Sequence, residues 1–308
     1  MHLAVSGKIN AAKLLFCALT SPPATMNGAF EVSETVALVT GTSSGIGLHT
    51  AVGLARKGLR VVATMRDTGK AEALLDEATA QGVDLIVRKL DLTDLDGARQ
   101  CLDTVAADVG PIGVLVNNAG QATVGTLEQL DQAALQQQLD VNFLGPAALT
   151  RHLLPSMRAT GAGRIVSVTS NGAVHGEPFL DAYCASKFAV EGLMQSLAPV
   201  AARFGVTVSV VEPASVLTSI LVNLDTQALS DSDGPYSKLL GRFFDTASAS
   251  MAQGQAAQAA ADVVIEAATT DTPRFRWQTS DTATELAALS LADLDGSRVF
   301  DAMTKWLD

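Results

Sequence analysis

Cysteine, histidine and aromatic residues are scarce in this chain, and each shortage excludes a class of protein. Its 308 residues include three cysteines, Cys17, Cys101 and Cys184, which lie far apart and lack the spacing of a metal site or a redox pair. We therefore expect a reducing, cytoplasmic environment without disulfides. The four histidines show no ligand spacing, so we expect no metal. Because only 5% of the residues are aromatic, we expect a core built mainly from Ala, Val and Leu.

Basic residues are also in the minority. The chain has 21 Lys and Arg against 32 Asp and Glu, which gives a formal net charge of −11. A protein this acidic has no general electrostatic reason to bind nucleic acid or anionic lipid. Spanning a bilayer takes about 20 apolar residues, and no run of that length is present. We therefore expect a small-molecule partner, no nucleic acid and no membrane span.

Residues 1–33 precede the first strand pattern. The apolar run Leu14–Leu19 follows two lysines and faintly resembles a signal peptide, but it is too short for one. We expect an N-terminal extension that is disordered or that results from a start codon placed too early, since Met26 stands just ahead of the first strand. Export is the alternative.

From Val36 onward, short apolar runs alternate with helical patterns. The expected strands are Thr35–Val39, Arg60–Thr64, Asp84–Lys89, Val114–Val116, Arg164–Val168, Val206–Val211 and Arg274–Gln278; the expected helices are Leu48–Lys57, Ala71–Gln81, Ala98–Val109, Gln132–Met157, Ala182–Phe204 and Ala252–Ala268. Nearly unbroken apolar strands indicate a sheet covered on both faces. The pattern predicts an α/β fold, one Rossmann-type doubly wound parallel sheet over residues 34–308.

The first strand runs into a glycine-rich loop and then a helix. The loop residues that we expect to hold a dinucleotide are Gly41, Ser43, Ser44, Gly45, Ile46 and Gly47. Glycines let backbone N–H groups approach a pyrophosphate, and the helix presents its positive N-terminal end to it. A string of this kind alone is weak evidence, but its place between strand and helix favours a dinucleotide site.

The spacing Gly41-x3-Gly45-x-Gly47 resembles the glycine motif of the short-chain dehydrogenase/reductase family. The likeness continues over about Val36 to Gln278, most of the chain. It implies further cofactor contacts at Asp91, Leu92, Asn118, Ala119, Gly120, Tyr183, Lys187, Pro213, Val216 and Thr218, although Ala214 stands where the family has Gly. Local strings around Gly45, Met65 and Tyr183 are most similar to those of estradiol and retinol dehydrogenases, which implies a lipophilic alcohol or ketone as substrate.

The resemblance also implies a catalytic set of Asn142, Ser170, Tyr183 and Lys187. Tyr183 and Lys187 are four residues apart on a predicted helix and so share a face. A nearby ammonium favours phenolate, which suits Tyr183 to proton transfer with the substrate oxygen. Ser170 would hold the same oxygen, and the family role of Asn142 is to hold a water that connects Lys187 to solvent. We interpret Cys184 as core packing.

Two regions are expected to contact the substrate besides Ser170 and Tyr183. Glu177 lies in the loop between them, where a merely solvated charge is the alternative. The segment Ser219–Ala249 lacks clear periodicity, and we expect it to form a substrate lid. Its apolar residues Leu221, Leu224, Leu239, Phe243 and Phe244 would give that lid an inner side.

Cofactor choice is predicted from the end of the second strand. An NAD enzyme of this type carries an acid there to bind the ribose hydroxyls, whereas this chain has Met65 and then Arg66. Arg66 suits a 2′-phosphate, so we expect NADP(H); an ordinary surface arginine is the alternative. We expect Asp67 to turn away from the ribose.

Other functions remain open on the sequence. A catalytically silent dinucleotide-binding regulator is one, although the complete catalytic set argues against it. A sugar-nucleotide epimerase or dehydratase of a related fold is another, although those proteins usually have a longer C-terminal substrate domain.

The active-site helix has more apolar residues than are needed to cover one face: Phe188, Val190, Leu193, Met194 and Leu197. The surplus predicts that the protein is a homodimer or homotetramer.

Overall fold

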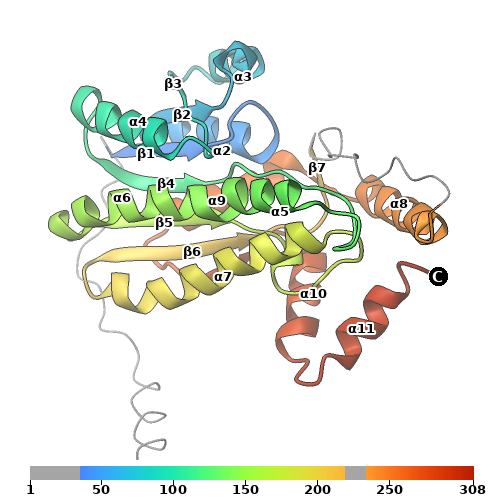
Figure 1. The fold of residues 1–308 in the computed structure, drawn as a ribbon. Coiled ribbons are helices and arrows are strands. Elements are labelled where there is room, and N and C mark those ends of the chain that lie inside the picture. Colours follow the sequence, from blue (N-terminus) through green and yellow to red (C-terminus); the bar gives the residue numbers. More distant parts are fainter. Residues whose placement is uncertain (1–34, 219–233) are drawn as a thin grey trace, which may run out of the picture.

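The computed structural model describes residues 35–218 and 234–308. They contain a seven-stranded parallel sheet in the order β3-β2-β1-β4-β5-β6-β9 (Figure 1). Its strands are β1 (Val36–Thr40), β2 (Arg60–Met65), β3 (Ile86–Lys89), β4 (Ile112–Asn117), β5 (Gly163–Val168), β6 (Val206–Glu212) and β9 (Arg276–Gln278). The predicted doubly wound fold is confirmed.

Helices cover both faces of the sheet. One face carries α2 (Gly45–Arg56), α3 (Glu72–Ala80) and α9 (Ala257–Thr269), and the other carries α4 (Leu95–Asp108), α6 (Gly145–Thr160) and α7 (Asp181–Ala202). Strands with both faces buried are mostly apolar, and all five residues of β1 and all six of β5 are buried, including the polar Thr40, Arg164 and Ser167. Ala, Val and Leu dominate the two cores, as expected.

The order of the strands fixes where a ligand can bind. From β1 the chain proceeds outward to β2 and β3, then returns to β4 on the other side of β1. Parallel sheets leave a crevice at the carboxyl ends of the strands on either side of such a reversal. The glycine loop follows β1 and the Asn118 turn follows β4, so both lie at this crevice.

The expected helix Gln132–Met157 is wrong as one continuous helix. The structure has α5 (Gln132–Leu139), then a π-helical turn at Asp140–Leu144, then α6. Such a turn accommodates one extra residue within a helix and is frequent at functional sites. It contains the candidate residue Asn142.

The sequence also predicted an irregular segment at Ser219–Ala249, and this prediction is wrong for the part of the segment that the structure describes. Residues 219–233 lie outside the described part of the chain, and so do Leu221 and Leu224. Ser237–Ala252 is a helix, α8. Its apolar residues Leu240, Phe243, Phe244 and Ala247 do recur at helical spacing, but serines, threonine and Gly241 among them dilute the pattern.

The remaining elements complete the C-terminal region. The short strands β7 (Val216–Leu217) and β8 (Gln255–Ala256) pair with each other, so α9 begins at Ala257 and not at Ala252 as expected. Two helices that the sequence pattern did not reveal, α10 (Asp281–Leu291) and α11 (Ser297–Thr304), follow β9. Within residues 35–218 and 234–308, no helix combines the length and hydropathy needed to cross a membrane.

Candidate active site

A cavity of about 860 Å³ opens at the carboxyl ends of β1, β2, β4, β5 and β6. Its wall runs from the glycine loop and the end of β2 to α7 and the C-terminal elements. All of the expected cofactor residues line it: Gly41, Ser43, Ser44, Gly45, Ile46, Gly47, Met65, Arg66, Asp91, Leu92, Asn118, Ala119, Gly120, Tyr183, Lys187, Pro213, Val216 and Thr218. The fold therefore brings residues from six separate sequence motifs to one cavity.

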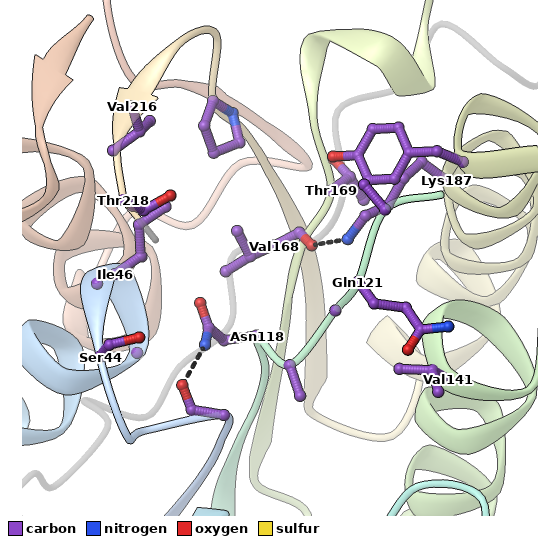
Figure 2. Close-up of a pocket in the computed structure, with 18 of the residues that line it drawn as sticks. Ser44, Ile46, Asn118, Gln121, Val141, Val168, Thr169, Lys187, Val216 and Thr218 are labelled. Carbon is purple, nitrogen blue, oxygen red and sulfur yellow. Dashed lines mark hydrogen bonds between the residues drawn. The ribbon is translucent and has the colours of Figure 1, made fainter. Parts of the chain in front are cut away.

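The glycine loop is locked to the turn after β4. The Asn118 side-chain amide donates hydrogen bonds to the carbonyl oxygens of Thr40 (2.9 Å) and Gly41 (3.1 Å), as Figure 2 shows in part. The Thr40 hydroxyl oxygen accepts from the backbone N–H groups of Asn118 and Ala119, both at 3.0 Å. A Cβ on Gly47 would overlap the Asn118 amide and the Gly41 carbonyl, so glycine is required there. Asn118 thus holds the loop in addition to lining the cavity.

Two basic and two acidic side chains gather at the β2 end of the cavity. Arg66 lines the wall there, together with Lys70, which the sequence analysis did not identify. Burial opposes ionisation of Asp91, but hydrogen bonds from Thr93 and the nearby Arg66 hold the pKa of this carboxyl below its usual value. Asp67 lines the same end, and its carboxylate accepts a hydrogen bond from the Gly69 N–H (2.9 Å); that it turns away from the ribose stays a prediction.

Tyr183 and Lys187 lie one turn apart on α7, at the opposite end of the cavity. The Lys187 ammonium nitrogen is 5.9 Å from the centre of the Tyr183 ring. It donates a hydrogen bond of 3.0 Å to the Val168 carbonyl oxygen at the end of β5 (Figure 2). Ser170 follows β5; its hydroxyl donates to the Asn171 side-chain oxygen (3.1 Å), accepts from the Gly172 N–H (3.0 Å) and lies near enough to influence the Tyr183 phenol. The three predicted catalytic side chains are therefore together.

Burial controls the ionisation of this pair. Desolvation raises the pKa of Tyr183 far above its usual value; the hydrogen bond from Ser170 opposes this rise, and the carboxylate of Glu177 adds to it. Desolvation also lowers the pKa of Lys187 to about 8, which Glu191 opposes. Both effects disfavour charge in this part of the cavity. The phenol is consequently protonated at neutral pH, whereas the nearby ammonium had led us to expect a lowered pKa.

Asn142 lies behind the cavity wall. Its amide donates to the Gln121 carbonyl oxygen (2.9 Å) and the Ser186 hydroxyl (3.0 Å), and its side-chain oxygen accepts from the Gln121 N–H (3.0 Å). A Cβ on Gly120 would lie 3.4 Å from both the Asn142 oxygen and the Lys187 ammonium. Asn142 therefore connects the π-helical turn, the loop after β4 and α7 close to Lys187.

An apolar wall faces Tyr183 from the C-terminal side. Phe243 of α8 packs against the rings of Phe179, Phe244 and Trp306 at centroid distances of 5.6, 5.4 and 6.2 Å. Val124, Leu180, Phe243, Phe244, Ala247 and Trp306 line the cavity here. The expected contribution of Phe243 and Phe244 agrees with this arrangement, whereas Leu239 is not on the wall. Sequence reasoning missed Trp306, because nothing in the pattern of the last ten residues connects them to the loops after β4 and β5.

Two other expected residues can be placed. Glu177 lines the cavity. Cys184 is buried, and burial raises the pKa of its thiol to about 12, so it is core packing, as expected, and not an activated nucleophile.

Comparison with known proteins identifies the family. The model of the short chain dehydrogenase family matches residues 35–229. This chain belongs to that family. It is therefore an oxidoreductase, and the family assignment that the motifs implied is confirmed.

The chain resembles several members of the short-chain dehydrogenase family along most of its length. It is 38% identical over 270 residues to retinol dehydrogenase 8 of Bos taurus, which covers 84% of this chain and 86% of the relative. It is 34% identical over 284 residues to estradiol 17-beta-dehydrogenase 1 of Rattus norvegicus, covering 88% and 81%. Among solved structures, a short-chain dehydrogenase/reductase of Burkholderia phymatum in complex with NAD has a TM-score of 0.75 and 26% identity, covering 87% and 97%.

Proposed function

We propose that this dehydrogenase interconverts a carbonyl and a primary or secondary alcohol on a small lipophilic molecule, with NADP(H) as cofactor. The observation that carries the proposal is the pair Tyr183 and Lys187 on the wall at one end of a cavity, with the buried Ser170 behind them, while the other end carries Arg66 and Lys70. The first end suits proton transfer to a substrate oxygen, and the second suits a phosphate.

The residues present fit a nicotinamide dinucleotide. The cavity continues from the glycine loop to Tyr183, and the absence of a side chain at Gly47 lets the Gly41 carbonyl and the Asn118 amide meet and fix that loop. The loop and the N-terminal end of α2 would hold the pyrophosphate. Arg66, with Lys70, would bind the ribose 2′-phosphate, and Pro213, Val216 and Thr218 would flank the nicotinamide. When bound, this cofactor supplies or accepts the hydride.

The chain's own residues supply the proton. In the direction of reduction, the neutral Tyr183 phenol donates its proton to the substrate oxygen. Ser170 donates a hydrogen bond to the same oxygen and fixes its position. Lys187, held by the Val168 carbonyl, stabilises the phenolate that results. Asn142 supports the backbone of Gln121 and would hold the water that returns a proton to Lys187.

The similarity to retinol dehydrogenase 8 and estradiol 17-beta-dehydrogenase 1 and the apolar wall around Phe243 support a lipophilic substrate. In this proposal α8, the described part of the expected lid over residues 219–249, covers that substrate within a single domain of residues 34–308; residues 219–233 lie outside the described chain. Glu177 contacts the substrate beside Tyr183.

A homodimer or homotetramer and a cytoplasmic location complete the proposal. Of the apolar residues on α7, Val190 and Met194 are buried in the core and Leu193 and Leu197 pack against it, whereas Phe188 is 43% exposed. Phe188 is thus available for an interface between subunits. Light scattering at micromolar concentration is expected to give a mass at least twice that of the chain, and Phe188→Asp is expected to reduce it.

The experiment that tests the activity is a screen of ketones and alcohols with the purified full chain. We expect net oxidation of NADPH with a lipophilic ketone, and none with Tyr183→Phe. Turnover without net change in the cofactor would instead support an epimerase, and cofactor binding without any turnover would support a silent regulator.

A further inference from the structure

Glu177 brings a carboxylate to the substrate end of an otherwise apolar wall. The other two acidic residues that line the cavity within the described chain, Asp67 and Asp91, lie at the β2 end. The Glu177 side chain is only 11% exposed. Because burying an ionised carboxylate is costly unless it is hydrogen bonded, this charge needs partners.

Two neighbouring side chains engage one of the two carboxylate oxygens. Oε1 accepts a hydrogen bond of 3.1 Å from the Asn171 amide and lies 3.5 Å from Nε2 of His175, which is itself buried. The Ser170 hydroxyl donates to the other end of the same Asn171 side chain, at 3.1 Å. A continuous path of hydrogen bonds therefore connects Glu177 with Ser170, which is paired with Tyr183.

The backbone around Glu177 is also fixed. Its N–H donates to the sulfur of Cys184 at 3.4 Å. Phe179, two residues later, has a φ of 60°, a conformation that costs energy for a bulky side chain and persists only where the surroundings enforce it. The Gly125 N–H donates to the Phe179 carbonyl oxygen at 2.8 Å and holds the turn. The carboxylate thus has a set position before any substrate enters.

The second oxygen, Oε2, is the one that remains for a ligand. Glu177 lines the cavity, and no group in the described part of the chain forms a hydrogen bond with Oε2. Gly172 lies between Glu177 and Tyr183. A Cβ placed on this glycine would be 3.4 Å from Glu177 Oε1 and also 3.4 Å from Cε1 of the Tyr183 ring. The carboxylate is therefore adjacent to the catalytic phenol, within reach of a substrate group close to the reacting carbon.

We propose that Glu177 selects carbonyl substrates that carry a hydroxyl or ammonium group near the reacting carbon, with Oε2 accepting the hydrogen bond from that group. An ionised carboxylate can only accept, so a donor on the substrate is required. A ketone without the donor would leave the buried charge unpaired, which carries a penalty in binding. The substrate is then amphipathic, with the donor near Tyr183 and the apolar part against Phe243. This inference rests on the proposed carbonyl–alcohol chemistry.

The test uses two ketones of equal chain length, 2-decanone and 1-hydroxy-2-decanone, with NADPH and the full chain. The kcat/KM of the wild type is expected to be about ten- to a hundredfold higher for the hydroxyketone than for 2-decanone. This factor corresponds to the free energy of one hydrogen bond to a charged group. Glu177→Leu is expected to bring the ratio close to one, by lowering kcat/KM for the hydroxyketone and keeping or raising it for 2-decanone. Glu177→Gln, which retains an acceptor oxygen, is expected to give an intermediate ratio.

Glu128→Gln is the matched control, because Glu128 is exposed and off the cavity wall, bound to the hydroxyl of Tyr236 at 2.5 Å. It is expected to leave the ratio unchanged. If Glu177 has only a structural role, Glu177→Leu would lower kcat/KM for both ketones equally. An unchanged ratio of the two kcat/KM values in this variant, with NADPH affinity retained, would overturn this inference and leave the proposed function intact. If the wild type oxidises NADPH with neither ketone nor any other of the carbonyl panel, both the proposed function and this inference fail.

Discussion

The Lys187 ammonium donates its hydrogen bond of 3.0 Å to the carbonyl oxygen of Val168, the last residue of β5. A backbone carbonyl at a strand end has a fixed position, so it fixes the lysine as well. The contact leaves the Tyr183 hydroxyl to interact with Ser170 and with the substrate. In the proposed mechanism, the sheet itself thereby places the positive charge that would stabilise the phenolate.

Tyr183→Phe tests the assigned proton donor. The substitution removes the hydroxyl and keeps the buried ring, so folding and cofactor affinity are expected to change little. Turnover is expected to fall at least 10²-fold, roughly the value of general acid catalysis, and further if substrate orientation is lost too. Steady-state kinetics with NADPH and nicotinamide fluorescence titration measure the two quantities. Retention of more than about a tenth of the activity would contradict the assignment.

Cofactor preference follows from Arg66. We expect NADPH to bind at least about tenfold more tightly than NADH, because a charge-assisted contact to the 2′-phosphate is worth about 1.5–3 kcal/mol. The double substitution Met65→Asp with Arg66→Ala is expected to reverse this order. Fluorescence titration gives the dissociation constants, and the same titration of Lys70→Ala measures how much the second cation contributes to NADPH affinity. Equal or tighter binding of NADH by the wild type would show that Arg66 does not read the phosphate.

Gly47→Ala is expected to abolish cofactor binding. A methyl group there would overlap the Asn118 amide and the Gly41 carbonyl, and so displace the loop that both hold. Gly192→Ala is the matched control, since it lies within α7 with open space around its Cβ position. That change is expected to be neutral or stabilising by up to about 1 kcal/mol. Thermal shift with and without NADPH distinguishes the two variants; a normal NADPH-induced shift in Gly47→Ala would refute the expectation.

Stability is expected to depend on pH through Glu191. This buried carboxylate accepts a hydrogen bond of 2.8 Å from the Thr169 hydroxyl and pairs with Arg276 at 2.8 Å. Burial nevertheless raises its pKa from 4.5 to about 7, with Glu212 adding to the rise. The folded state therefore binds this proton more tightly than the unfolded state, so the stabilisation is complete below about pH 4.5 and is lost as the pH rises through about 7.

Glu191→Gln removes this titration. The free energy of unfolding of the wild type is expected to fall more between pH 5 and pH 8 than that of the variant, as measured by urea denaturation. Lys187 titrates with the opposite sign near pH 8, and because Glu191 raises its pKa, the substitution is expected to lower that pKa further, which adds to the difference between the two proteins in the same direction. Parallel pH dependence of the two proteins would count against the raised pKa.

The apolar wall is tested by Phe243→Ala. Phe243 is 3% exposed and joins α8 to Phe179 and Trp306, so its removal leaves a void beside the substrate. We expect a higher KM for long-chain ketones, a loss of about 3–5 kcal/mol in stability, and an unchanged NADPH dissociation constant. Leu239→Ala, on the same helix but off the wall, is the control. A similar rise in KM in both variants would show that Phe243 acts only through the helix.

The parts of the fold that follow from local pattern could be predicted. All seven strands of the main sheet were expected, because strands buried on both faces are mostly apolar and are followed by helices or turns. The catalytic residues were placed through motif spacing, since Tyr183 and Lys187 need only a helix to share a face. The candidate cofactor residues other than Tyr183 and Lys187 could be proposed because they lie at or just beyond the ends of strands at the same edge of the sheet.

The rest depends on contacts between distant segments. Trp306 reaches the cavity only because the chain after α11 packs on α8, a relationship that no local spacing encodes. Lys70 lies beside Arg66 because Asp67 caps a short 3-10 turn, and that cap also brings Asp67 to the wall. The role of Glu177 depends on Asn171 and His175, whose side chains meet it only in the folded loop.

The π-helical turn at Asp140–Leu144 amounts to a one-residue insertion in an otherwise regular helix. Because the wider turn absorbs the extra residue, a single deletion within it would restore a regular α-helix and keep α5 and α6 in phase, but would remove the bulge that carries Asn142. The amide of Asn142 would then leave Gln121 and Ser186, while the rest of the sheet and its helices kept their places. Insertion and deletion are thus far from equivalent at this position: the active site depends on the count of residues here as much as on their identity.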